Sequence, residues 1–196
     1  MALRYLSADA LLADSQTLAL NILNSGFQPD LLVALWRGGA PVGLAIHEVL
    51  VATGHRCEHW PLRAESYAGI ARQHEVRFFG LDQLQPMLQM STRILLVDDV
   101  FDTGLTMQQL LKHIGSLAAQ QSQDIRIATP WYKPGNNQTA LTPHYHLHTT
   151  ADWLVFPHEL QDLGDTEILA KPGNRAVLAA VVAMRRLRTP TTKPPH

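Results

Sequence analysis

Cysteine is almost absent from this chain of 196 residues, which contains one, Cys57. A single cysteine cannot form an internal disulfide, so we expect no disulfide framework and a cytoplasmic location. An excess of charge of one sign is also missing, because 16 Lys and Arg residues oppose 17 Asp and Glu residues. The formal charge of -1 gives no general attraction to nucleic acid or to an anionic membrane, so any anion must be bound by a local site.

Long hydrophobic runs are missing as well. The most apolar long segment, AVLAAVVAM at 176–184, is far shorter than the roughly 20 residues that span a bilayer, so we interpret it as a packed helix. The length fits a single domain, which we place at 1–188. The remaining residues, 189–196, have the proline-rich sequence TPTTKPPH and are predicted to be a disordered tail.

Apolar residues at helical spacing predict a first helix over residues 8–24, followed by Gly26 as a stop signal. The run LLVAL at 31–35 then predicts a buried strand. After it come the residues WRGG and a helix that starts near Pro41 and ends near Gly54. This order is strand, glycine loop, helix.

The same order recurs in the second half of the chain. The strand RILLVDD is followed by a loop at 100–105, a helix over about 106–121 and a further strand, IRIATPW. Repeated units of this kind predict an α/β fold with a doubly wound, mostly parallel sheet flanked by helices. Between them, residues 63–80 are polar with weak periodicity, which indicates a long exposed loop or a poorly formed hairpin, of the kind that often acts as a lid.

The stretch ILLVDDVFDTGLTM at 94–107 holds the densest group of chemical side chains. Gly104 allows a tight turn, Thr103 and Thr106 add hydroxyls, and amides at a helix start complete the parts of a phosphate-binding loop. No lysine follows, which excludes a nucleoside-triphosphatase loop. Taken alone, an ordinary turn capped by Asp102 or Thr103 is about as good an interpretation.

The adjacent carboxylates of Asp98 and Asp99 favour the functional interpretation. Two neighbouring carboxylates repel each other unless hydroxyls or a metal ion satisfy them. A receiver domain also contains such a pair, but near its start, and it has a phosphate-accepting aspartate at a later strand end. Here the pair comes halfway along the chain, and the later strand IRIATPW ends in no aspartate.

Over its whole length, ILLVDDVFDTGLTM resembles the phosphoribosyl-pyrophosphate motif of type I phosphoribosyltransferases. The resemblance implies the type I fold, with a small hood at about 140–170. It also implies that Asp98 and Asp99 hold the ribose hydroxyls and that Asp102 is the catalytic base. The loop that would bind the 5'-phosphate consists of Asp102, Thr103, Gly104, Leu105 and Thr106.

By itself, WRGG at 36–39 is an ordinary turn sequence. After a strand of the same sheet it resembles the family's pyrophosphate loop, in which Arg37 and the amides of Gly38 and Gly39 would contact the leaving group. This loop often holds a strained peptide in the family, which makes Trp36-Arg37 a candidate for a cis peptide bond.

Two later stretches, PWYKPGNNQ and ADWLVFPHEL, resemble the purine branch of the family, particularly xanthine-guanine phosphoribosyltransferases. Alone, Lys133 would be interpreted as a solvated loop charge and Trp153 as a core aromatic residue. The resemblance implies instead that Lys133 binds the exocyclic O6 of a 6-oxopurine and that Trp153 stacks on its ring. The carbonyls of Leu154 and His158 would meet its 2-position.

The same resemblance implies Mg²⁺ as cofactor, near Glu159 and Asp98, and a mobile lid that contains Ser66 and Tyr67. The substrates would be phosphoribosyl pyrophosphate and guanine, xanthine or hypoxanthine, in purine salvage. We expect a homo-oligomer, such as a dimer, and no nucleic-acid or membrane partner. Two alternatives stay open: a non-catalytic regulator that senses phosphoribosyl pyrophosphate, and a transferase for a pyrimidine base such as orotate or uracil.

The sequence HYHLH places His144, His146 and His148 at alternate positions. Alternate residues of a strand share a face, which is one requirement of a metal site. No cysteine or close acidic residue completes a tetrahedral zinc set, so an exposed face is the favoured interpretation.

Overall fold

The computed structural model of the chain describes residues 2–68, 74–117 and 123–188, with only the backbone for 66–68, 74 and 75. The predicted tail at 189–196 lies outside these ranges. The chain divides into two compact units. The larger unit is Leu11–Ala151, and the smaller combines the residues up to Ala10 with those from Asp152 onward.

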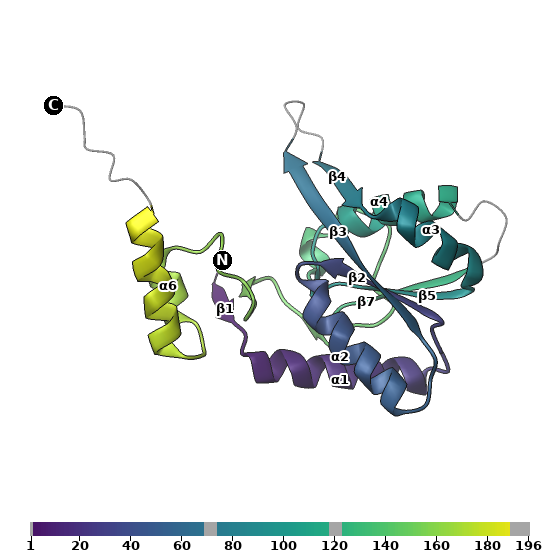
Figure 1. Ribbon diagram of the computed structural model, residues 1–196, viewed down its shortest axis with the longest axis horizontal. Coiled ribbons are helices and arrows are strands. Elements are labelled where there is room, and N and C mark those ends of the chain that lie inside the picture. Colours follow the sequence, from purple (N-terminus) through teal and green to yellow (C-terminus); the bar gives the residue numbers. More distant parts are fainter. Residues whose placement is uncertain (1, 69–73, 118–122, 189–196) are drawn as a thin grey trace. The chain divides into compact units, whose positions relative to one another are not determined.

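The larger unit is built on a five-stranded sheet in the order β4-β3-β2-β5-β7 (Figure 1). Strand β2 pairs in parallel with β3 and β5, and β5 pairs in parallel with β7, whereas β4 is antiparallel to β3. The sheet is therefore mostly parallel, as the sequence predicts. Its strands are β2 (Leu31–Trp36), β3 (Glu58–Ala68), β4 (His74–Phe79), β5 (Arg93–Val97) and β7 (Asp124–Ala128).

Helices cover both faces of this sheet. On one face, α3 (Leu81–Met90) and α4 (Leu105–Leu117) join a core cluster that includes Leu31, Val33 and Leu96. On the other face, α2 (Gly39–Ala52) packs so closely on β2 that a Cβ at Gly43 would lie 2.6 Å from the Cβ of Ala34. Helix α1 (Ala8–Asn24) matches the predicted bounds 8–24.

A second, three-stranded sheet lies beyond the end of β5. It consists of β6 (Val100–Phe101), β8 (Trp131–Tyr132) and β9 (His148–Thr149), all parallel, in the order β6-β8-β9. The predicted strand IRIATPW thus splits into β7 and β8 at Thr129 and Pro130. This small sheet brings two loops together, because parallel neighbours end at the same edge.

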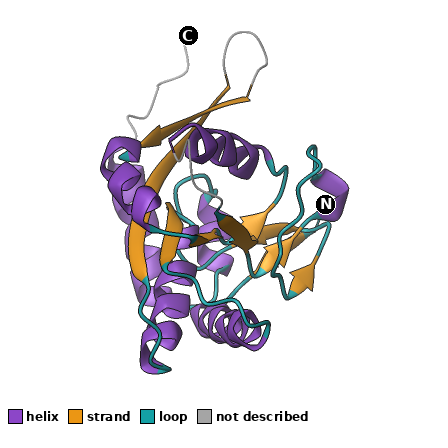
Figure 2. Ribbon diagram, turned by 90° about the vertical axis from the view of Figure 1, so that its right-hand side faces the viewer, coloured by secondary structure: helices purple, strands orange, loops and turns teal. Residues whose placement is uncertain are grey.

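The polar stretch at 63–80 is a hairpin formed by β3 and β4, one of the two predicted alternatives. Its strands reach past the neighbouring helices in Figure 2. Helix α3 was not predicted, because Pro86 interrupts a short polar segment that buries only Leu84 and Leu88. The structure describes helix α4 as far as Leu117, and the predicted extension to 121 lies outside the described residues.

The smaller unit has its own core. Strands β1 (Leu3–Tyr5) and β10 (Trp153–Val155) pair in parallel, followed by α5 (Asp165–Ala170) and α6 (Arg175–Arg188). The core residues are Val155, Leu163, Ile168 and Val182. Helix α6 contains the predicted helix at 176–184, but Val182 is its one buried residue, so it packs along a narrow stripe only.

Candidate active site

The predicted functional loops of the larger unit meet beyond the carboxyl ends of β2 and β5, where ligands bind in sheets of this type. A cavity of about 180 Å³ lies there. Arg37 comes from the loop after β2, Asp98 from the loop after β5, and Thr106 from the first turn of α4. The structure therefore brings the predicted pyrophosphate, ribose and phosphate loops to one place. The remaining lining residues are Leu35, Trp36, Ala64 and Val76.

The WRGG loop packs directly against the acidic pair. The Trp36-Arg37 peptide bond is cis, as the resemblance to the family's pyrophosphate loop suggested. A Cβ atom at Gly38 would lie 2.1 Å from Asp99 Oδ2, and one at Gly39 would lie 2.4 Å from the carbonyl oxygen of Val97. Both distances are far below a van der Waals contact, so this approach requires glycine at both positions.

The two aspartates share a confined environment. Asp99 is 8% exposed, and its backbone N–H donates to Asp98 Oδ1 at 3.0 Å. Burial and then the charge of Asp99 raise the pKa of Asp98 well above its usual range, against the opposing effect of the Asp99 and Gly39 amides. Asp98 retains some exposed surface and lines the cavity. Hydroxyl donors or a cation placed there would stabilise its ionised form.

The loop from Asp102 to Thr106 makes a tight turn into α4. Gly104 has a φ of 77°, and a Cβ there would lie 2.6 Å from Thr139 Oγ1. The hydroxyl of Thr103 accepts from the Leu105 amide at 3.4 Å, a local contact two residues before the start of α4. The amides at the start of α4 give the loop a partial positive charge suited to an anion.

Asp102 and Lys133 meet because they follow neighbouring parallel strands. Phe101 of β6 is in register with Tyr132 of β8, and the Lys133 amide donates to the Phe101 carbonyl at 2.9 Å. Lys133 Nζ lies 3.1 Å from Asp102 Oδ2. Because Lys133 is 4% exposed, the interpretation as a solvated loop charge is wrong.

Sequence reasoning missed a third member of this group. Asn136 Nδ2 donates to Asp102 Oδ1 at 2.7 Å. Lys133 precedes a single 3₁₀ turn, Pro134–Asn136, and Asn136 ends it, with its amide donating to the Lys133 carbonyl at 3.1 Å. The i, i+3 spacing of two donors around Pro-Gly was the available signal, since residues three apart in a 3₁₀ turn lie on one side.

Three of the predicted purine-binding residues, Trp153, Leu154 and His158, lie in the smaller unit. Trp153 is 54% exposed, and its backbone amide donates to the Ala2 carbonyl at 2.9 Å. Leu154 pairs with Arg4 between the two strands, and the His158 ring stacks on Phe156 at 5.6 Å.

The Glu159 carboxylate, predicted to lie near a metal ion, accepts from the Phe156 amide at 2.9 Å. On the other side of that residue, Lys171 Nζ donates to the Phe156 carbonyl. Burial lowers the pKa of Lys171, and the charge of Glu159 partly opposes this. In the smaller unit Glu159 therefore has a structural contact as well.

The predicted lid residues belong to the β3–β4 hairpin. Ser66 pairs with Val76 and Tyr67 with Glu75 along the backbone. The side chains of Ser66 and Tyr67 lie outside the described part of the structure. Strand β4 of the hairpin is held to α4, because the Val76 amide donates to Gln109 Oε1 at 3.0 Å.

The three histidines after β8 have separate partners. His144 Nδ1 accepts from the Ile127 amide at 3.1 Å, the His146 ring contacts Tyr132 at 5.3 Å, and His148 Nε2 lies 3.0 Å from Asp14 Oδ2. His144 and His146 are exposed and His148 is half-buried. Over the described ranges, no cluster of three or more His, Cys, Asp or Glu side chains is arranged to hold a metal ion.

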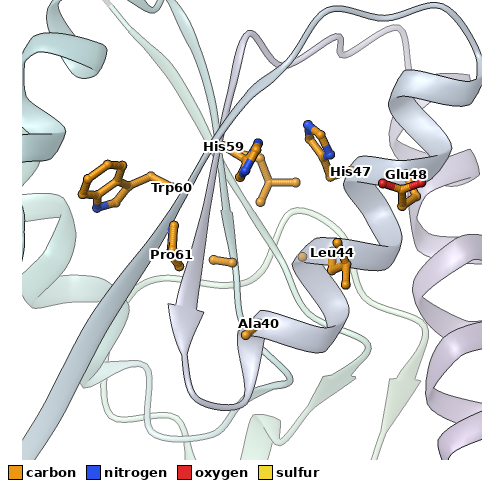
Figure 3. A pocket seen from close by; sticks show the side chains of 10 residues that line it. Ala40, Leu44, His47, Glu48, His59, Trp60 and Pro61 are labelled. Carbon is orange, nitrogen blue, oxygen red and sulfur yellow. The ribbon is translucent and has the colours of Figure 1, made fainter.

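A second hollow, of about 260 Å³, lies between α2 and β3 (Figure 3). The rings of His47 and His59 line it and contact each other edge to face, with centroids 4.6 Å apart, and Leu44 and Glu48 line it from α2. None of the predicted site residues lines this hollow. It is a separate feature from the cavity at Asp98.

Comparisons with known proteins identify the fold. The family model "phosphoribosyl transferase domain" matches residues 2–162. Among solved structures, a purine phosphoribosyltransferase from Pyrococcus horikoshii superposes with a TM-score of 0.62 at 22% identity, covering 84% of this chain and 98% of its own. A protein from Neisseria gonorrhoeae with bound ppGpp gives a TM-score of 0.68 at 18% identity, with 94% and 98% covered.

A third similar structure is the xanthine-guanine-hypoxanthine phosphoribosyltransferase of Helicobacter pylori, with a TM-score of 0.56, 19% identity, and 79% and 91% of the two chains covered. At such identities the likeness concerns the fold. Comparison with curated proteins gives no match. None of the helices in the described ranges has the length and apolar character needed to cross a bilayer.

Proposed function

The chain belongs to the phosphoribosyl transferase domain family and has the type I fold, and from this premise we propose that it is a 6-oxopurine phosphoribosyltransferase. The enzyme transfers 5-phosphoribosyl from phosphoribosyl pyrophosphate to a nitrogen of guanine, hypoxanthine or xanthine, in purine salvage. The new bond forms between that nitrogen and the anomeric carbon. The bond from this carbon to pyrophosphate breaks, and pyrophosphate leaves with the electron pair.

The observation that carries this proposal is the contact between Lys133 and Asp102. Lys133 is a buried cationic donor, which suits the carbonyl O6 of a 6-oxopurine and not the amino group of adenine. Asp102 is a carboxylate 3.1 Å away, suited to accept the proton that the purine nitrogen loses. A purine bound by Lys133 would therefore lie next to the carboxylate of Asp102.

The remaining loops of the larger unit are assigned to phosphoribosyl pyrophosphate. Asp98 and Asp99 accept from the ribose hydroxyls, and the amides and hydroxyls of the loop from Thr103 to Thr106 bind the 5'-phosphate. Arg37, with the amides of Gly38 and Gly39, binds the pyrophosphate as negative charge develops on it. The raised pKa of Asp98 supports this assignment, because perturbed carboxyls gather at functional sites.

Magnesium fits this donor set. Mg²⁺ is usually held by one or two carboxylates together with substrate phosphates, and Asp98 lines the cavity with Asp99 next to it in the chain. Asp98 would hold it, and Glu159 stays an expectation from the family resemblance. When bound, it would neutralise charge on the pyrophosphate leaving group.

The remaining purine contacts in this proposal are those that the family resemblance implies for Trp153, Leu154 and His158. The exposed Trp153 offers an aromatic face for stacking, and the carbonyls of Leu154 and His158 would accept from groups at the 2-position. We assign the smaller unit to the hood, predicted at about 140–170, and the β3–β4 hairpin with Ser66 and Tyr67 to a lid that excludes water. A homodimer completes the proposal.

A second candidate is a regulator that senses phosphoribosyl pyrophosphate or a related nucleotide. The ppGpp bound to the Neisseria gonorrhoeae protein supports this candidate. The buried Lys133 beside Asp102 argues against it, because a sensor of the sugar phosphate alone has no need of a purine-binding donor. A transferase for orotate or uracil is the alternative within the enzyme class.

A pyrophosphate-release assay separates these functions. The protein is supplied with Mg²⁺, labelled phosphoribosyl pyrophosphate and, separately, guanine, hypoxanthine, xanthine, adenine, orotate or uracil. Release with a 6-oxopurine supports the proposal, and release only with a pyrimidine replaces it. Tight binding of phosphoribosyl pyrophosphate in calorimetry, without release for any base, would establish the regulator instead.

A further inference from the structure

Both carboxylate oxygens of Asp102 are held by one short turn of the chain. Oδ2 lies 3.1 Å from Lys133 Nζ, and Oδ1 accepts from Asn136 Nδ2 at 2.7 Å. The two donors differ in kind, because Lys133 carries a charge and Asn136 is a neutral amide. A purine O6 competes with Asp102 for the ammonium group, whereas the amide has no such role in base recognition.

The turn that carries Asn136 is fastened to the phosphate loop. The Lys133 amide donates to the Phe101 carbonyl at 2.9 Å, and the Gln138 amide donates to the Thr103 carbonyl at 2.9 Å. The backbone on both sides of Asn136 is thus bonded to the residues that flank Asp102. Asn136 reaches Asp102 from a fixed support.

The neighbouring Asn137 accounts for the shape of the loop itself. Its Nδ2 donates to the Leu141 carbonyl at 2.7 Å, and its Oδ1 accepts from the Thr139 amide at 3.0 Å and hydroxyl at 2.9 Å. Asn136, by contrast, directs its side-chain amide to Asp102. The two adjacent asparagines therefore have different roles. Asn137 stabilises the loop, and Asn136 contacts the candidate base Asp102.

We propose that Asn136 is a positioning residue that fixes Asp102 through Oδ1, so that Oδ2 is the oxygen that takes the purine proton. This inference rests on the proposed function. When O6 draws on Lys133, the hydrogen bond from Asn136 prevents the carboxylate from rotating with the ammonium group. The proton passes from the purine nitrogen to Oδ2 while the nitrogen bonds to the anomeric carbon and pyrophosphate departs. A misplaced acceptor is costly, since an error of about 1 Å can lower a rate by roughly 10²-fold.

The test compares Asn136→Ala and the nearly isosteric Asn136→Asp with Gln138→Ala, a control in the same loop whose exposed side chain is replaced while its bonded backbone amide remains. We expect kcat with a 6-oxopurine to fall about 10-fold in Asn136→Ala and further in Asn136→Asp, which sets two carboxylates against each other. The calorimetric Kd for phosphoribosyl pyrophosphate with Mg²⁺ should change less than about 2-fold. Gln138→Ala should match the parent.

A readout independent of turnover is the carboxyl carbon resonance of Asp102, assigned by its loss in Asp102→Asn. At neutral pH this resonance should shift in Asn136→Ala and stay in place in Gln138→Ala. An unmoved resonance overturns the inference whether or not any base is a substrate. So does an unchanged kcat, or a loss of affinity for phosphoribosyl pyrophosphate as large as the loss of kcat. If the Asp102 resonance shifts but the protein turns over no base, the proposed function is wrong, and the contact between Asn136 and Asp102 is still established.

Discussion

Lys133 Nζ lies 3.1 Å from Asp102 Oδ2, although 31 positions separate the two residues in the chain. The ion pair joins the ends of two neighbouring parallel strands, β6 and β8. Its lysine side chain is 5% exposed and its aspartate side chain 36% exposed. Removing either partner therefore affects the other, which bears on every test of the purine site.

Asp102→Asn preserves the size of the side chain but removes the proton acceptor. We expect kcat with a 6-oxopurine to fall roughly 10² to 10⁴-fold while affinity for phosphoribosyl pyrophosphate changes little. Steady-state kinetics and calorimetry on the same preparation measure both quantities. Turnover at the parental rate would refute the assignment of Asp102 as the base.

Lys133→Ala tests the origin of base selectivity. In the parent, adenine would place an amino donor against the buried ammonium, and polar sites reject such mismatches by about 10⁴-fold or more. We expect activity with at least one 6-oxopurine, little with adenine, and a loss of this discrimination in the variant. The ratio of kcat/KM for guanine and adenine measures it. Equal use of both bases by the parent would contradict the assignment of Lys133.

Asp98→Asn tests whether the acidic pair is kept at a cost in stability. The folded-state pKa of Asp98 is raised above 3.8, so the folded protein binds more protons than the unfolded chain above that pH, and the free energy of unfolding falls as pH rises through this window. Asparagine stays neutral and escapes this loss. We expect the Tm of the variant to exceed that of the parent at neutral pH, by about 2–4 °C per kcal/mol recovered.

This difference in Tm should shrink as pH falls towards 3.8 and vanish well below it, where Asp98 is protonated in both states. Calorimetric scans without Mg²⁺ or substrate measure it, and the same variant should bind phosphoribosyl pyrophosphate more weakly. A variant no more stable than the parent at any pH would show that the surroundings of Asp98 already stabilise its charge.

Gly38→Ala tests the close approach of the WRGG loop to the acidic pair. The added Cβ would lie 2.1 Å from Asp99 Oδ2, so either the loop or the carboxylate must move. We expect affinity for phosphoribosyl pyrophosphate to fall at least about 10-fold, since misplaced polar groups lose their hydrogen bonds. Calorimetric titration measures it.

Gly115→Ala is the matched control, because a Cβ there meets nothing within 4 Å and the residue lies in α4. Replacing a helical glycine should stabilise the protein by roughly 0.5–1 kcal/mol and leave binding unchanged. If both variants bound phosphoribosyl pyrophosphate like the parent, the WRGG loop would not belong to the site.

The sequence by itself determined the parts of the molecule that depend on local patterns. The apolar run from Ile94 to Val97 required a buried strand, and a period of 3.6 residues marked α1. The residues of the loop from Asp98 to Thr106 indicated a turn suited to an anion beside paired carboxylates, and the resemblance of this stretch to the phosphoribosyl-pyrophosphate motif implied a sugar-phosphate site. Local chemistry of this kind is readable from neighbouring residues.

The tertiary structure alone decided which distant residues meet. Strand β8 is two residues long, too short for a pattern, yet its register with β6 places Lys133 against Asp102. Asn136 reaches the same carboxylate only because a 3₁₀ turn reverses the chain after Lys133. The raised pKa of Asp98 likewise follows from burial beneath the WRGG loop. Strand pairing and burial depend on contacts between residues far apart in the chain, and no local pattern encodes their distances.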